Sequence, residues 1–161
     1  MVFAELERMR YQMATLTELA GSTSLAVGKS MSQELQEHLL RLAGQVCRHR
    51  YLYGLCIPGG LTWDPPAAAL AALRSGLAGV AGEFATLEQL FVHTSSFLDR
   101  IEEMGTLRPE VADLYGVVGP VARASGRTVD LRRSLPYGAY AEHPPQVPRE
   151  IEGDGYARLR V

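Results

Sequence analysis

The residues best suited to chemistry are concentrated in one stretch near the end of the chain, GPVARASGRTVDLRR, Gly119–Arg133. These fifteen positions hold four arginines, one aspartate and two glycines. Arginines around one carboxylate can form a buried, charge-assisted network, because the guanidinium donates to carboxylate oxygens in a fixed fork geometry. We therefore expect Arg123 and Arg132 to bind Asp130 and to fasten this loop onto the rest of the fold.

This network has a structural and a functional interpretation, and the residues leave both open. In the first it is an architectural staple; in the second, Arg123 or Asp130 lines a proton or substrate path. Tyr137 and Tyr140 follow Pro136 with a spacing of three. We expect these two tyrosines to pack on the same network.

A second basic group, Arg48, His49 and Arg50, follows a helical pattern. Positive charge in the last turn complements the carbonyl end of the helix dipole, so a capping role is one interpretation. His49 and Arg50 are also candidates for contact with a pocket or a partner protein.

The cysteine content does not indicate a metal site. Cys47 and Cys56 are the only cysteines, nine positions apart, and this spacing matches no Cys-x-x-Cys pair of a zinc or iron–sulfur site. We expect Cys56 to be a buried, small apolar side chain. We assign no metal to this chain.

Composition excludes two classes of partner. The 161 residues are the size of one domain, and 16 basic side chains nearly balance 18 acidic ones, so broad attraction to nucleic acid or anionic lipid is not indicated. The most apolar region, Pro65–Leu98, contains Arg74, Glu83 and Glu88, which leaves no run of about 20 apolar residues for a membrane span. The N-terminus lacks the apolar run of a secretory signal, so we expect a cytoplasmic protein.

Apolar residues spaced by three and four predict long helices that would position these side chains. The first is expected over 2–20. A second is expected to open at Ser30, whose spacing to Gln33 matches a capping box, and to end near Val46. A third is expected to begin at the pair Asp64 and Pro65, as N-cap and first turn.

The third apolar stripe continues to Ile101, which would give one helix of about 48 Å, with a break expected within residues 93–96. A short helix is predicted over 109–115. The final stretch YARLRV alternates like the start of a strand. The expected fold is mainly α: an antiparallel bundle of three to four long helices over 1–115, with little β and an irregular, Pro/Gly-rich segment over 116–161 docked on it.

Four stretches occur in an order that resembles one protein family: ELER at 5–8, HRYLYGLCIPGG at 49–60, LYGVVGPVARASGRTVDLRRSLPYGAY at 114–140 and GDGYAR at 153–158. The chain resembles the large subunit of energy-converting NiFe hydrogenases of the formate hydrogenlyase or hydrogenase-4 type. It equally resembles the D subunit of NADH:quinone oxidoreductase (NADH dehydrogenase), a complex that binds NAD. The resemblance implies a substrate pocket beside an iron–sulfur small subunit, with the helical bundle as scaffold.

The resemblance also bears on cofactors. In the hydrogenase branch two Cys-x-x-Cys pairs hold a nickel–iron centre, and this chain has neither pair. In the quinone branch an N-terminal sheet, which would precede Met1, holds the quinone headgroup. Gln12 stands where the family commonly has a histidine, which puts that histidine's proton-linked role in doubt here. We therefore expect no cofactor in this chain, with iron–sulfur clusters in the partner subunit.

We expect the chain to be the helical-bundle fragment of such a subunit, not catalytic alone. Its expected partners are the iron–sulfur small subunit and other subunits, at the cytoplasmic face of the inner membrane. The alternative is a free-standing, non-catalytic scaffold or assembly protein derived from the family. Exposed apolar patches and self-association of the isolated chain would favour the first, and a monodisperse monomer the second. The branch stays open, although YLYGLCIPGG favours the hydrogenase side.

Overall fold

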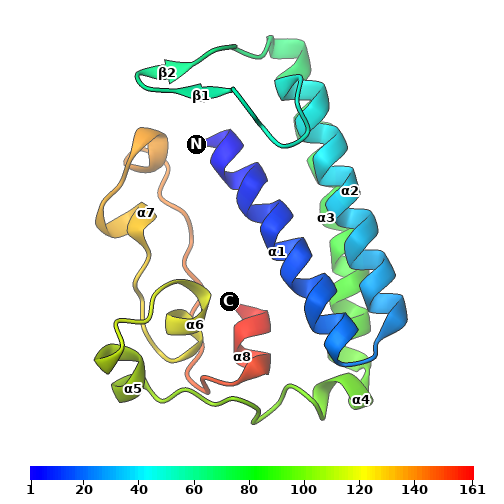
Figure 1. The fold of residues 1–161 in the computed structure, drawn as a ribbon, viewed down its shortest axis with the longest axis vertical. Coiled ribbons are helices and arrows are strands. Elements are labelled where there is room, and N and C mark those ends of the chain that lie inside the picture. The colour runs from blue at the N-terminus through cyan, green and yellow to red at the C-terminus, as the bar shows by residue number, and fades with distance from the viewer. The chain divides into compact units, whose positions relative to one another are not determined.

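The computed structural model describes residues 1–161 and confirms the mainly α class. Helices hold 61% of the residues and strands 2%. The chain divides into two compact units, which we name the helical unit (Val2–Thr94) and the C-terminal unit (Ser95–Val161). Figure 1 shows long helices in the first unit and short helices joined by loops in the second.

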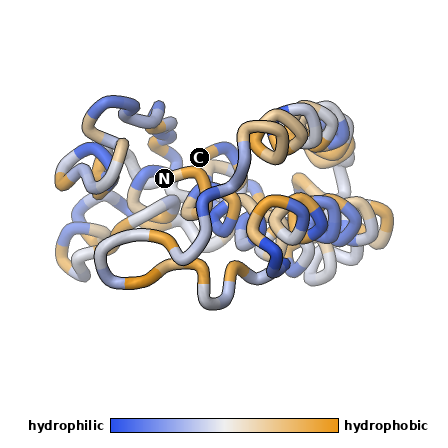
Figure 2. Tube along the Cα trace, turned by 90° about the horizontal axis from the view of Figure 1, so that it is seen from above, coloured by the Kyte–Doolittle hydropathy of each residue, from blue (hydrophilic) through white to orange (hydrophobic).

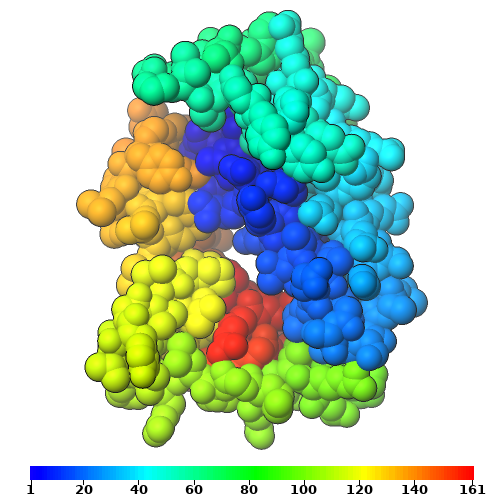
Figure 3. Space-filling view, in the orientation of Figure 1, coloured from blue at the N-terminus to red at the C-terminus, as the bar shows by residue number.

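Three long helices form the helical unit: α1 (Val2–Ser22), α2 (Ala26–Cys47) and α3 (Ala67–His93). α2 packs against α1 on one side and against α3 on another, and successive helices run in opposite directions (Figure 1). In the space-filling view the side chains of α1 and α2, in blue and light blue, lie against each other (Figure 3). The expected antiparallel packing of long helices is present.

Apolar stripes on the three helices build the core of this unit. Figure 2 shows apolar and polar segments alternating along the helices, as one-sided burial requires. A Cβ atom at Gly76 of α3 would lie 2.3 Å from a methyl carbon of Leu42, so this glycine lets α3 approach α2 closely. The buried apolar side chains include Leu6, Met13 and Ala20 of α1, Leu35, Leu39 and Val46 of α2, and Leu73, Val80, Leu87 and Phe91 of α3.

The capping box predicted at Ser30 is wrong, because α2 begins four residues earlier, at Ala26. The chain reverses direction at Ser24, which has a left-handed φ of 62°. Leu25 is the N-cap and makes no side-chain capping bond. The buried face of α2 therefore begins upstream of the apparent cap, at Gly28.

Both ends of α3 depend on residues with extended backbone. The predicted start at Asp64 is wrong: α3 begins at Ala67, after Pro66 in an extended conformation. A proline disfavours helical backbone in the residue before it, so two successive prolines delay the helix. The expected break is confirmed, since Thr94 is extended and separates α3 from the single turn α4 (Ser95–Leu98).

A small hairpin, β1 (Cys56–Ile57) and β2 (Gly60–Leu61), joins α2 to α3 with Cys56 paired to Leu61. Cys56 is exposed and Cys47 is buried, so the expected burial of Cys56 is wrong. The preceding residue, Leu55, is only 3% exposed and packs in the core. Both residues of β1 are exposed, so Cys56 faces solvent. No helix of the chain is both long and apolar enough to cross a bilayer.

The C-terminal unit contains more helix than the sequence predicts. Gly119–Arg133, expected as a loop, includes two short helices, and YARLRV is helical rather than the start of a strand. The docking of 116–161 on the bundle stays a prediction, and the chain divides into its two units after Thr94. Beyond α4 the elements are α5 (Pro109–Leu114), α6 (Gly119–Ala124), α7 (Leu131–Ser134), the 3-10 turn η1 (Gly138–Tyr140) and α8 (Gly155–Arg160).

Candidate functional site

Helix α6 carries Arg123 into the interior of the C-terminal unit. Gly119 has a φ of 72°, a backbone conformation that glycine adopts at little cost, and Pro120 lies in the first turn, where its missing N–H is not needed. The Ser125 hydroxyl donates to the carbonyl of Val121 at 3.0 Å and closes the helix. Arg123 is buried with its neighbours Ala122 and Ala124.

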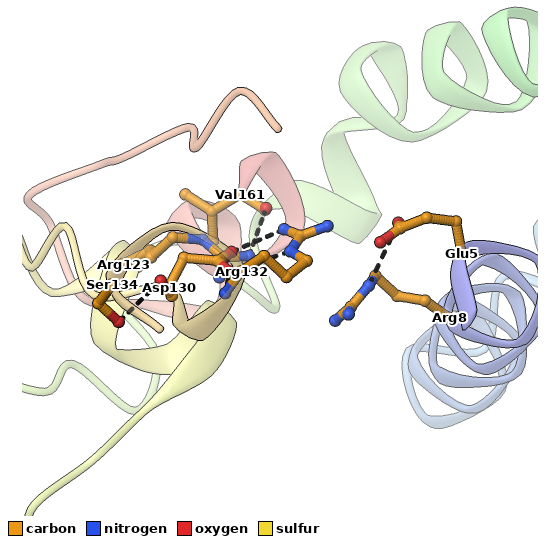
Figure 4. Close-up of polar contacts among 7 residues, drawn as sticks. All are labelled: Glu5, Arg8, Arg123, Asp130, Arg132, Ser134 and Val161. Carbon is orange, nitrogen blue, oxygen red and sulfur yellow. Dashed lines mark hydrogen bonds and ion pairs between the residues drawn. The ribbon is translucent and has the colours of Figure 1, made fainter. Parts of the chain in front are cut away.

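The carboxylate of Asp130 lies between two guanidinium groups (Figure 4). Arg132 donates its backbone N–H and its Nε to Oδ1, both at 2.9 Å, and its Nη2 to Oδ2 at 2.6 Å. Arg123 Nη1 lies 3.5 Å from Oδ2. The side chains are between 7% and 12% exposed, so the three residues singled out in the sequence meet in one buried ion-pair network.

Arg123 also connects α6 to the last residues of the chain. Its Nη2 donates to the carbonyl of Val161 at 3.1 Å (Figure 4). Its own carbonyl accepts from the amide of Glu150 at 3.1 Å, and the carbonyl of Ala124 accepts from the amide of Gly153 at 2.9 Å. The network therefore fixes the tail together with the loop.

The stretch GDGYAR forms a second anchoring point, which sequence reasoning did not identify as a site. Asp154 is buried and accepts from the amides of Ala157 and Glu103, both at 2.7 Å. Arg158 Nη2 donates to the carbonyl of Gly153 at 2.9 Å. The spacing of Asp154 to Ala157 is that of an N-cap, which was the available signal; it also explains why YARLRV is helical.

The electrostatics of the network favour a fixed charge. The hydrogen bonds from Arg132 and the positive charges of Arg132 and Arg123 outweigh desolvation and lower the pKa of Asp130 to about 2. At neutral pH the carboxylate is ionised and has no proton to donate. The ionised carboxylate therefore forms a charge-assisted ion pair with both guanidinium groups.

The lowered pKa predicts acid sensitivity of the C-terminal unit. Because the folded-state pKa of Asp130 lies below the ordinary value of 3.8, its contribution is complete above that value and is lost as pH falls toward 2. We expect a loss of about 2 kcal/mol in the free energy of unfolding across this range. Urea unfolding at several pH values measures it, and the Asp130→Asn variant should lack this component. Equal pH dependence of the two proteins would contradict the prediction.

The two tyrosines after Pro136 differ in exposure. Tyr140 is 2% exposed, whereas Tyr137 is 53% exposed. Their rings meet edge to face, with centroids 4.9 Å apart. Tyr140 thus belongs to the interior and Tyr137 covers it from the surface.

His49 and Arg50 belong to the helical unit and have separate contacts there. His49 Nδ1 accepts from the amides of Tyr51 and Tyr53 at 3.2 and 3.4 Å, and its ring stacks on Tyr53. Arg50 pairs with Glu37 of α2. His49 therefore contacts turn amides and a tyrosine ring, and Arg50 contacts a glutamate side chain. At the end of α2 it is the amide of Arg48, the C-cap residue, that donates to a helix carbonyl. In the same unit, Glu5 and Arg8 of the ELER stretch pair at 3.3 Å (Figure 4).

The cysteines do not fit the nickel–iron centre of the hydrogenase branch. Cys47 lies in an apolar cluster with Val46 and Leu55, where burial raises the pKa of its thiol. Cys56 lies exposed on the hairpin. Two thiols in such different surroundings cannot supply the four thiolates of two Cys-x-x-Cys pairs.

The three long helices, the buried Arg–Asp network and the tail anchored through Asp154 define a mainly α-helical protein. The chain belongs to the family of the respiratory-chain NADH dehydrogenase 49 Kd subunit, whose family model matches residues 27–161. The recognition from the four ordered stretches is confirmed.

Individual relatives agree with this family. The D subunit of the NADH-quinone oxidoreductase of Pelobacter propionicus is 32% identical over 92% of this chain, and the D 2 subunit of the same enzyme in Streptomyces griseus is 34% identical over 98%. A chain of the membrane-bound sulfane sulfur reductase, an archaeal respiratory membrane complex, superposes with a TM-score of 0.88 at 25% identity over 97% of this chain. The present chain spans between 36% and 42% of the length of these three proteins.

The family model and both sequence relatives are NADH dehydrogenase proteins. The hint toward the hydrogenase branch from YLYGLCIPGG gains no support from them.

Proposed function

We propose that this chain is the helical-bundle portion of a subunit in a respiratory electron-transfer complex, where it holds an iron–sulfur partner subunit in place without catalysing a reaction alone. Membership of the 49 Kd subunit family over residues 27–161 supports this proposal. Its relatives are subunits of NADH-quinone oxidoreductase. In this proposal the nickel–iron or quinone chemistry of the family takes place outside these 161 residues.

The observation that carries the proposal is the exposure of large apolar side chains in the C-terminal unit. Within 22 residues, five large apolar side chains are between 59% and 77% exposed. Large apolar side chains exposed to water favour contact with a partner protein, because burial against the partner removes them from water. The five side chains are Leu114, Tyr115, Val118, Leu131 and Leu135.

The Arg–Asp network would then position the exposed leucines at the two ends of α7. Leu131 lies in α7, directly after the N-cap residue Asp130, and Leu135 is the residue that ends the helix. We assign Arg123, Asp130 and Arg132 a positioning role, and the exposed Tyr137 is a further candidate for partner contact. The complex would place the chain at the cytoplasmic face of the inner membrane through its partner subunits.

The test is purification of the affinity-tagged chain from membranes of its own host in mild detergent. We expect co-elution with a protein that carries iron and acid-labile sulfide, and loss of that protein in a Leu131→Ser, Leu135→Ser double variant. A matched control, Leu61→Ser on the hairpin of the helical unit, should retain it. Recovery of the tagged chain as a monodisperse, iron-free monomer would instead support the free-standing scaffold.

A further inference from the structure

Helix α3 has an outer face that contacts no other helix of its unit. The buried residues of α3 lie on one side, and Glu83 faces α2, where it meets His38 at 2.9 Å. Residues spaced by four and three share one helix face. Five exposed residues with this spacing form what we call the outer stripe: Arg74, Ala78, Ala81, Ala85 and Glu88.

The outer stripe points away from α2. Ala81 precedes Glu83 by two positions, which is about 200° around a helix of 3.6 residues per turn. Two large apolar side chains flank the stripe, Leu70 at 42% and Phe84 at 37% exposure. The face therefore offers apolar surface that a second helix would remove from water.

The two charges of the stripe have no partner within the chain. Neither Arg74 nor Glu88 makes an ion pair or a hydrogen bond, and both are exposed. Arg74 is the only arginine of the helical unit with neither an ion pair nor an aromatic contact. The others are Arg8, Arg10, Arg41 and Arg50, which pair with glutamates, and Arg48, which stacks on Trp63.

The order of these charges is self-complementary. Arg74 and Glu88 stand about 21 Å apart along the helix with three alanines of the stripe between them. In an antiparallel pair of identical helices centred on Ala81, Arg74 of each copy lies opposite Glu88 of the other. A parallel pair would instead set Arg74 beside Arg74 and Glu88 beside Glu88, which repel. The same antiparallel register puts each Phe84 opposite Ala78, a large side chain against a small one.

We propose that the outer stripe of α3 is an interface with a second copy of this chain, formed as an antiparallel, two-fold symmetric helix pair. Such an interface uses the same patch on both copies, so every favourable contact occurs twice. The alanines let the two helices approach closely, and the charges set their direction and register. This inference does not depend on the proposed respiratory function, because it uses only the helical unit.

The test is sedimentation velocity of the full chain over a concentration series. We expect the mass to rise from that of the 17.6 kDa chain to twice that value. Arg74→Glu or Glu88→Arg should each weaken self-association about tenfold, because two attractions become two repulsions. An equimolar mixture of the two variants should recover the pair, since each variant complements the other.

The control is the variant Ala72→Arg. Ala72 is exposed and precedes Ala81 by nine residues, which places it on the opposite side of the helix from the outer stripe. It should associate like the original chain, and circular dichroism should show equal helicity for all variants. A monomer at every concentration would overturn the proposal. Unchanged association of both charge variants, or no recovery in the mixture, would overturn it as well. Self-association is measured on the isolated chain, so its outcome does not depend on whether an iron–sulfur protein co-elutes in the purification from membranes.

Discussion

Replacing Asp130 with asparagine is expected to lower the free energy of unfolding of the C-terminal unit by about 3 kcal/mol. The substitution leaves the guanidinium groups of Arg123 and Arg132 buried without the carboxylate between them. It also weakens the N-cap of α7, because a neutral amide replaces the charged carboxylate that accepts a hydrogen bond from the Arg132 amide. Urea unfolding followed by circular dichroism measures the change.

The matched control for this variant is Asp113→Asn, which removes the carboxylate that pairs with Arg127. That pair is a surface one, with the Asp113 side chain 59% exposed, so its loss should cost less than about 1 kcal/mol. Equal effects of the two substitutions would show that burial adds nothing to the Asp130 network and would refute the positioning role assigned to it.

A single methyl group at Gly153 is expected to destabilise the C-terminal unit by about 3 kcal/mol. In the Gly153→Ala variant the Cβ atom would lie 2.2 Å from the carbonyl oxygen of Leu107, and the backbone has a φ of 71°. Because the clashing atom belongs to the backbone, relief requires the tail to move off its hydrogen bonds with Leu107 and Ala124. Thermal and urea unfolding both report the loss.

Gly116→Ala separates the two causes. Gly116 has a similar φ of 60° but no atom within 4 Å of a Cβ, so only the backbone penalty of about 1 kcal/mol applies. If the two alanine variants were equally stable, the close approach of the tail to Leu107 would not exist in solution.

The long helices could be predicted from sequence because their burial pattern is periodic and extends over many turns. Their starts could not. Ser30 offers a capping-box spacing, yet α2 begins at Ala26 and its buried face at Gly28, and the pair Pro65 and Pro66 delays α3 beyond the apparent N-cap at Asp64. One cap contributes only about 1 kcal/mol, so a cap-like spacing in the sequence does not by itself fix where a helix begins.

The candidate site was predictable in part. Asp130 and Arg132 are two positions apart, and Arg123 follows a turn-forming stretch, so their meeting could be inferred locally. The role of Asp154 could not, because one of its donors, the Glu103 amide, is 51 positions away in the chain. Helices as short as α6, α7 and α8 have little stability alone. They depend on such distant contacts, so the sequence alone predicts a loop over Gly119–Arg133 and a strand at YARLRV.

The central claim is that the Asp130 network and the GDGYAR anchor hold α6 and the tail as one structural unit. Amide hydrogen exchange of the full chain tests it directly at Glu150 and Gly153, whose amides donate to α6 carbonyls. We predict that both amides are protected, and that Asp130→Asn lowers their protection together by about a hundredfold. Exchange at the rate of an unfolded chain in the unaltered protein, or protection indifferent to Asp130→Asn, would contradict the account.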